Sequence, residues 1–102
     1  MDVERCKEFV VLAQTRNFLE ASNQLFISQS SLSKHIKSLE KELGVTLLDR
    51  STRKVELSSI GRVFLPYAKR IARTNYELQT ALFDQLENER MILTIGSIPV
   101  MA

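Results

Sequence analysis

The chain has no tryptophan, one cysteine, one histidine and only three glycines among its 102 residues. A single cysteine cannot form an intrachain disulfide, and with one histidine it does not make the cluster that a structural zinc site needs. No apolar run approaches the ~18 residues that span a bilayer, and no signal peptide precedes Asp2. We therefore expect a cytoplasmic protein without disulfide, metal or membrane partner.

The composition also lacks the usual features of an enzyme. We find no carboxylate pair, no nucleophile with an adjacent base and no glycine-rich phosphate loop, so catalysis is not expected. Hydrophobic residues make up 44% and charged residues 25%, which is typical of one small soluble core. The net charge of +2 says little about partners, but residues 34–54 carry six basic and only three acidic side chains.

The segment from Ser28 to Gly44 has the periodicity of an amphipathic helix. Four apolar residues, spaced four, three and four apart, lie on one side of it: Leu32, Ile36, Leu39 and Leu43. Polar and basic residues lie close to the opposite side: Ser30, Lys34, Lys37 and Lys41. Ser28 provides a hydroxyl for the N-terminal cap, and Gly44 permits the positive φ that ends a helix.

Two interpretations of the polar side are open. The lysines could form an ordinary solvated face paired with the nearby glutamates. Serine, glutamine and lysine at the N-terminal end instead favour contacts with base edges and phosphates in a major groove. The candidate DNA-contacting residues of this helix are Ser28, Gln29, Ser30, Ser33, Lys34 and Lys37.

The preceding residues predict a short helix and a sharp turn. Asn17 and Glu20 have the spacing of a capping box, and a helix of about two turns follows. We expect Ser22 to bond a carbonyl one turn back. Phe26 lies at the turn and could be a core residue, a corner filler or an exposed contact. Together, the residues from about 18 to 37 have the layout of a helix-turn-helix.

A further amphipathic helix is predicted after Asp2, and the three helices can share one core. Cys6 lies on the apolar side of this helix, so it is interpreted as a small buried hydrophobe. His35, the only histidine, is interpreted as a flanking polar residue with no partner carboxylate.

After Gly44 the pattern becomes short and alternating, which predicts a two-stranded hairpin at about 46–57. Its tip would project basic residues that could contact a minor groove or phosphates, or it could be a solvated turn. The candidate residues here are Arg50, Thr52, Arg53 and Lys54. For Arg50 a phosphate and a neighbouring carboxylate are equally open as partners.

Residues 58–89 predict one long helix of about 45 Å. Apolar residues recur along it at steps of three and four, and the candidate dimerisation residues are Phe64, Ala68, Ile71, Leu78, Leu82 and Leu86. Packing on the three-helix core could use the first half alone. The second half has nothing left in the chain to cover it, which favours self-association. A bend is expected near Arg62 and Val63, because Pro66 removes one backbone bond.

A set of positions matches a known family pattern in register across about the first 65 residues: Phe9, Ala21, Leu25, Ser28, Gln29, Leu32, Ser33, Ile36, Leu39, Glu40, Leu43, Gly44, Leu47, Arg50, Leu57 and Gly61. In these positions the chain resembles LysR-type transcriptional regulators. The resemblance implies a mainly α fold: a winged helix-turn-helix of three helices and a two-stranded wing, then a long dimerisation linker helix. It also implies that Gln29, Ser33 and Lys34 contact bases or phosphates and that Arg53 lies in the wing. Ser30 stands where the family usually has proline.

The resemblance divides the chain into a DNA-binding domain at 1–57, a linker helix at 58–89, and at 90–102 the first strand of an effector domain that is otherwise missing. A small-molecule effector would bind that missing domain, so no cofactor is expected in this chain. The chain is then either a fragment or a naturally short regulator. The resemblance further implies an antiparallel dimer, and for a full-length protein it admits a tetramer.

Two functions of different kind follow from these observations. In the first, a homodimer binds double-stranded DNA at an interrupted palindrome and controls transcription. In the second, the long helix is a protein-interaction module and the winged domain is its scaffold.

Overall fold

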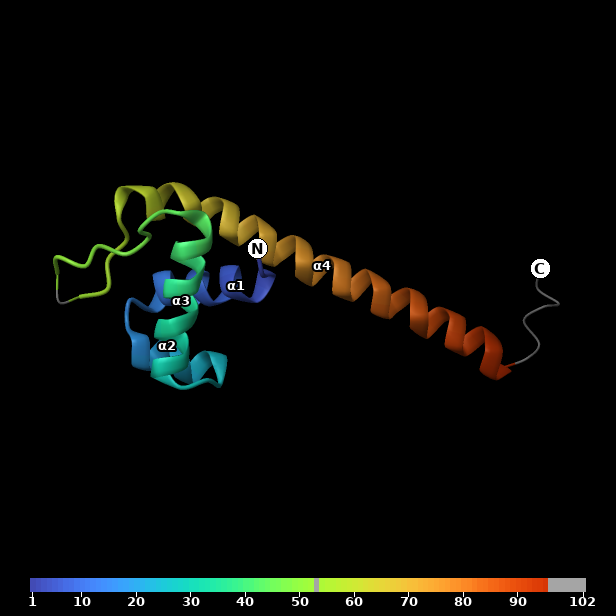
Figure 1. The fold of residues 1–102 in the computed structure, drawn as a ribbon. Coiled ribbons are helices and arrows are strands. Elements are labelled where there is room, and N and C mark those ends of the chain that lie inside the picture. The colour runs from blue at the N-terminus through green and yellow to red at the C-terminus, as the bar shows by residue number, and fades with distance from the viewer. Residues whose placement is uncertain (53, 96–102) are drawn as a thin grey trace. The chain divides into compact units, whose positions relative to one another are not determined.

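The computed structural model describes residues 1–52 and 54–95, and for 92–95 it describes the backbone only. It contains four helices in these ranges, α1 (Val3–Thr15), α2 (Phe18–Leu25), α3 (Gln29–Leu43) and α4 (Ser59–Ile95) (Figure 1). The chain divides into two compact units, Met1–Ala72 and the residues from Arg73 onward.

The residues predicted to cap the N-terminal ends of the first three helices are confirmed as caps. Each of the first three helices begins after a residue whose side-chain oxygen accepts a backbone N–H of the first turn: Asp2 for α1, Asn17 for α2 and Ser28 for α3, at 2.9, 2.9 and 3.0 Å. Gly44 follows α3 with a φ of 70°, in the left-handed region that favours glycine. Local polar chemistry therefore sets where these helices start and stop.

The core of the first unit lies where α1, α2 and α3 meet the first part of α4. Its buried apolar side chains are Cys6, Phe9, Leu12, Ala21, Leu32, Ile36, Leu39, Leu47, Leu48 and Ala68. Burial raises the pKa of the Cys6 thiol above its ordinary value of 9.0, although the N-terminal amine opposes this. The prediction of a buried, unreactive Cys6 is thus consistent with its surroundings.

The turn between α2 and α3 contains a conformation that large residues rarely adopt. Phe26 ends α2 in the left-handed region with a φ of 58°, and its side chain is 93% exposed. Phe26 is therefore neither a core residue nor a corner filler, and its side chain is exposed. Ile27 instead packs against the core, and the Ser22 hydroxyl donates to the carbonyl of Leu19 at 2.8 Å, as predicted.

The two-stranded wing predicted at 46–57 does not form as strands in the described residues. One isolated antiparallel bridge joins Leu48 to Leu57, and the Asp49 N–H donates to the Glu56 carbonyl at 2.8 Å. Beyond this point the backbone is drawn into a turn, because the Asp49 carboxylate accepts the Ser51 N–H at 3.0 Å. The segment is therefore a loop closed by one bridge, and the prediction of a regular hairpin was wrong. Arg53 lies outside the described residues.

The start of α4 is hydrogen-bonded to Thr46 and Leu47, which directly precede the loop 48–57. We call this loop the wing loop. Ser58 donates its N–H to the Leu47 carbonyl at 2.8 Å and its hydroxyl to the Thr46 carbonyl at 2.6 Å. Gly61 accommodates this approach, because a Cβ at that position would run into the Leu47 carbonyl and lie 3.3 Å from the Leu57 Cβ. Only glycine fits here without a shift of the backbone.

Helix α4 continues through Pro66 and ends at Ile95, beyond the predicted end at residue 89. Residues 90–95, predicted as the beginning of a strand, are therefore helical, and the rest of that strand lies outside the described residues. Residues 91–93 are apolar, but a strand is stable only beside a neighbouring strand with which it can pair. The bend expected at Pro66 stays a prediction.

Candidate nucleic-acid interface

Helix α3 separates a buried face from an exposed polar face. Leu32, Ile36 and Leu39 are at most 1% exposed. The predicted contact residues lie on the other side or at the N-terminal end: Ser28, Gln29, Ser30, Lys34 and Lys37 are exposed, and Ser33 is half-buried. The structure thus brings these six residues together on one accessible surface of one helix, which we call the α3 polar face.

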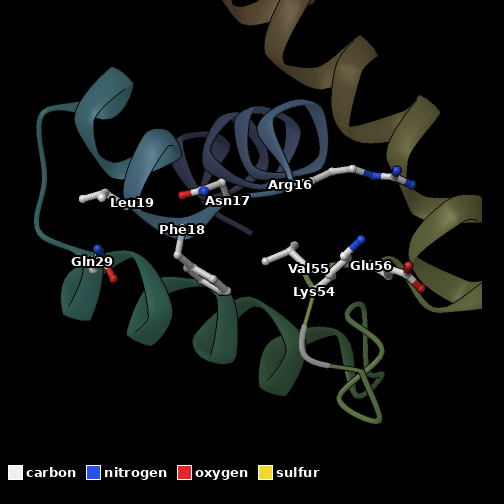
Figure 2. A pocket seen from close by; sticks show the side chains of 8 residues that line it. All are labelled: Arg16, Asn17, Phe18, Leu19, Gln29, Lys54, Val55 and Glu56. Carbon is white, nitrogen blue, oxygen red and sulfur yellow. The ribbon is translucent and has the colours of Figure 1, made fainter.

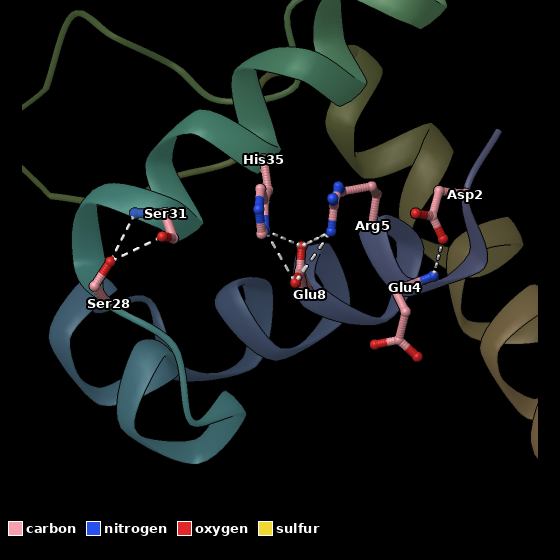
Figure 3. Close-up of polar contacts among 7 residues, drawn as sticks. All are labelled: Asp2, Glu4, Arg5, Glu8, Ser28, Ser31 and His35. Carbon is pink, nitrogen blue, oxygen red and sulfur yellow. Dashed lines mark hydrogen bonds and ion pairs between the residues drawn. The ribbon is translucent and has the colours of Figure 1, made fainter.

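The serines at the start of α3 are already engaged with one another. The Ser28 hydroxyl accepts the Ser31 N–H at 3.0 Å and lies 2.9 Å from the Ser31 hydroxyl (Figure 3). It also lies 3.2 Å from the Ser30 hydroxyl. Ser28 therefore acts first as the N-terminal cap of α3. This cap fixes the backbone at the N-terminal end of α3, where Gln29 is the first helical residue.

A hollow of about 540 Å³ lies beside the N-terminal end of α3 (Figure 2). It is lined by the start of α2, by Gln29 and by the end of the wing loop: Arg16, Asn17, Phe18, Leu19, Gln29, Lys54, Val55 and Glu56. The polar part of the lining comprises the cations of Arg16 and Lys54, the amides of Asn17 and Gln29 and the carboxylate of Glu56. Cations and amides are groups that contact phosphates, and Figure 2 shows Gln29 at one end of the hollow and Arg16, Lys54 and Glu56 at the other. Sequence reasoning identified Gln29 and Lys54 but missed Arg16, because only the fold brings the end of α1 to this surface.

The wing residues have distinct surroundings. The Arg50 guanidinium donates to the Glu40 carboxylate at 2.7 Å, so the carboxylate is the partner that the structure shows. Glu40 also accepts the N–H groups of Leu47 and Leu48 at 2.7 and 3.2 Å. Glu40 was not predicted as an anchor, yet it connects the end of α3 to the base of the wing loop.

The tip of the wing loop is exposed at Thr52 and Lys54. The Thr52 hydroxyl donates to the Lys54 carbonyl at 2.8 Å. Hydrogen bonds from the Ser51 hydroxyl and N–H hold the pKa of Asp49 below its ordinary value. The loop is therefore shaped by its own short polar residues.

The prediction that His35 has no carboxylate partner was wrong. The His35 Nδ1 lies 3.0 and 3.1 Å from the two carboxylate oxygens of Glu8, which also accept from Arg5 on α1 (Figure 3). Glu8 and His35 are far apart in the sequence, so helical periodicity within one segment could not pair them. The Arg5 and Glu8 spacing is a usual helical pair, but it does not point to α3.

The candidate dimerisation residues divide into two groups. Ala68 is fully buried, and Phe64 and Ile71 pack against the core, where the Phe64 and Phe9 ring centroids are 5.3 Å apart. In the second unit, Leu78, Leu82 and Leu86 are 50%, 50% and 60% exposed. The exposed apolar surface among these residues therefore belongs to the second group, which we call the distal apolar stripe.

No group of histidine, cysteine and acidic side chains within the described ranges could hold a metal ion. Over the same part of the chain, none of the helices has the length and apolarity to cross a bilayer.

Comparison with known proteins gives the same fold and places it in a family. Residues 3–62 match the family described as "Bacterial regulatory helix-turn-helix protein, lysR family". The chain is 42% identical over 86 residues to a "Probable RuBisCO transcriptional regulator" of Phaeodactylum tricornutum, covering 84% of this chain and 28% of that protein. It is 38% identical over 98 residues to a "Probable cat1 operon transcriptional activator" of Acinetobacter lwoffii, covering 96% and 32%.

Among solved structures, the chain is similar to the one described as "Crystal Structure of BenM_DBD/catB site 1 DNA Complex". The TM-score is 0.74 at 30% identity, over 85% of this chain and 97% of that chain. The chain spans only about a third of the length of the two regulators named above. The family match covers more than half of this chain and includes all of α1, α2 and α3. The chain therefore belongs to the lysR family of bacterial regulatory helix-turn-helix proteins.

Proposed function

We propose that this chain binds double-stranded DNA in a sequence-specific manner and is the DNA-binding part of a transcriptional regulator. The observation that carries the proposal is the α3 polar face, an accessible set of serine, glutamine and lysine side chains on a helix whose other side is buried. Such side chains hydrogen-bond base edges and phosphates when a helix enters the major groove. The similar structure described as a DNA complex supports the same assignment.

Within this proposal the residues have different tasks. Gln29, at the capped end of α3, reads base edges, whereas Lys34 and Lys37 neutralise phosphates. Lys54 and Arg16, at the hollow beside α3, face a phosphate strand, with Arg53 in the same loop as a further cation. Arg50 acts indirectly, because its guanidinium holds the Glu40 carboxylate.

We also propose that two copies associate through the distal apolar stripe. Exposed leucines spaced four apart on a helix lose contact with water when a second helix covers them. A dimer would present two copies of α3 to two half-sites, so the target is an interrupted palindrome. In a full-length regulator of this family, a ligand-sensing domain would follow the helix that corresponds to α4 and bind a small-molecule effector.

A titration with labelled DNA tests the proposal. Duplexes selected from a random pool first define the preferred sequence, and binding is then measured at several salt concentrations. We expect affinity to fall steeply as salt rises, and Lys34→Ala to reduce the salt slope by about one unit. The matched control is Lys69→Ala, which removes the same charge from an exposed position on α4.

Base readout is tested separately. Gln29→Ala should cost about 1–3 kcal/mol of discrimination at one base position while binding to unrelated duplexes is kept. Absence of any duplex binding by the wild type at low salt would contradict the proposed function. The exposed leucines of α4 would then favour the alternative, a protein-interaction module that works through this helix.

A further inference from the structure

The most unusual group in the first unit is a buried carboxylate between two helices. Glu8, on α1, is 5% exposed, although its neighbours in the core are apolar. Arg5 donates to both Glu8 oxygens at 3.3 and 3.5 Å, and His35 Nδ1 lies 3.0 and 3.1 Å from the same oxygens (Figure 3). We call Arg5, Glu8 and His35 the α1–α3 polar cluster.

Stability alone does not account for this cluster. Removing a carboxylate from water is costly, and apolar residues of similar size often stabilise such a position equally well or better. The surrounding contacts between α1 and α3 are apolar and therefore non-directional, so they bring the helices together without fixing their rotation or slide. A charge-assisted hydrogen bond has a preferred distance and angle, and it supplies the missing constraint.

The constraint acts on the helix that carries the α3 polar face. His35 follows Lys34 directly and lies between Ser33 and Lys37. Because base readout depends on placing side chains within about 0.5 Å, a small rotation of α3 would move all of them together. The contact with Glu8 fixes this rotation from the side of α3 that faces α1.

We propose that the α1–α3 polar cluster is a positioning device that holds α3 in register for base readout and thereby sets operator selectivity. The inference rests on the proposed function, DNA binding through α3, and adds residues to it that do not touch DNA. Glu8 is the central acceptor, His35 is the donor from α3, and Arg5 holds Glu8 from its own helix.

The cluster has a spectroscopic signature. A carboxylate accepts but does not donate, so His35 must carry a proton on Nδ1 whether its imidazole is neutral or charged. The neutral form of His35 is therefore the Nδ1–H tautomer. Since this is the only histidine in the chain, its nitrogen resonances need no separation from others.

The test compares variants of His35 against a selected operator and an unrelated duplex. His35→Leu keeps the bulk but removes the donor, and we expect it to lower the ratio of specific to non-specific affinity about tenfold. Its non-specific affinity and salt slope should equal those of the wild type. His35→Gln keeps an N–H donor and should recover most of the selectivity, while Ser38→Leu, at an exposed position on α3, is the matched control.

Each outcome is informative. A folded His35→Leu variant with the selectivity of the wild type would overturn the positioning role while leaving the proposed function intact. Should His35→Leu fail to fold, nitrogen spectra of the wild type decide, and a neutral His35 protonated on Nε2 would overturn the proposal. A wild type that binds no duplex would overturn the proposed function and, with it, this role.

Discussion

The two units of the chain use the same sequence pattern to different ends. In Met1–Ala72, the apolar sides of the helices are covered, and the largest core side chains are fully buried. In the unit from Arg73 onward, leucines with the same helical spacing remain at least half exposed. Periodicity therefore predicts which side of a helix is apolar, but it does not say whether that side is covered by the same chain or by another.

The largest expected effect comes from placing a charge on the distal apolar stripe. Leu82→Glu should give monomers and lower operator affinity by about 10²–10⁴-fold. In a dimer, binding of one copy of α3 holds the second copy at a high effective concentration near the second half-site, and a monomer lacks this gain. Sedimentation and duplex titration measure the two effects. Asn88→Glu adds the same charge at an exposed position off the stripe and should remain dimeric. Dimers of Leu82→Glu would show that the exposed leucines do not form the interface.

The stability of the first unit should be sensitive to substitution at Gly61, where α4 closely approaches the Leu47 carbonyl. Gly61→Ala places a methyl group against the Leu47 carbonyl and should destabilise the unit by about 1–3 kcal/mol in chemical denaturation. Gly44→Ala meets no atom within 4 Å but adopts a φ of 70°, and we expect a cost of about 1–2 kcal/mol. A Gly61→Ala variant as stable as the wild type would show that α4 moves freely relative to residues 46–47.

A smaller effect, of opposite sign, is expected at the exposed turn. Phe26→Asn should stabilise the first unit by about 0.5–1 kcal/mol, since asparagine tolerates the left-handed region and a side chain that is 93% exposed loses little burial. Thermal and chemical unfolding measure the change. Arg16→Asn, at the other non-glycine residue with a positive φ in the described ranges, is the comparison and should stabilise for the same backbone reason. A clear loss of stability in Phe26→Asn would mean that the ring is covered in solution.

The smallest effect is expected from the pH dependence of the wing loop. Hydrogen bonds from Ser51 lower the pKa of Asp49 from its ordinary value of 3.8. A pKa that is lower in the folded state stabilises the fold above the unfolded pKa, and this contribution is lost as the pH falls through the folded pKa. Asp49→Asn should therefore flatten the stability profile slightly below about pH 4. Identical profiles of variant and wild type would mean that this turn is not formed in solution.

The helices of the first unit could be predicted because their signals are local. Asn17 and Ser28 cap helices within three residues of themselves, and Gly44 ends α3 through its own backbone freedom. The exposed positions of Gln29, Lys34 and Lys37 follow from the periodicity of the same segment. None of these predictions needs information about a distant residue.

The wrong predictions concern contacts and pairings over longer distances. A strand requires a partner, and the residues after Asp49 turn back on themselves instead of continuing the pairing of Leu48 with Leu57. Residues 90–95, where the family resemblance implied the start of a strand, are helical, and a strand there would need a neighbouring strand to pair with.

By itself, the sequence determined the positions of the first three helices, their apolar sides and the polar face of α3, because capping and helical periodicity act within a few residues. Only the tertiary structure decided that Glu8 meets His35, that Arg50 meets Glu40, and that the first part of the α4 stripe is buried while Leu78, Leu82 and Leu86 stay exposed. Such pairings depend on how whole helices pack against one another. Packing brings together residues that are far apart in the sequence, and no local sequence pattern relates these residues.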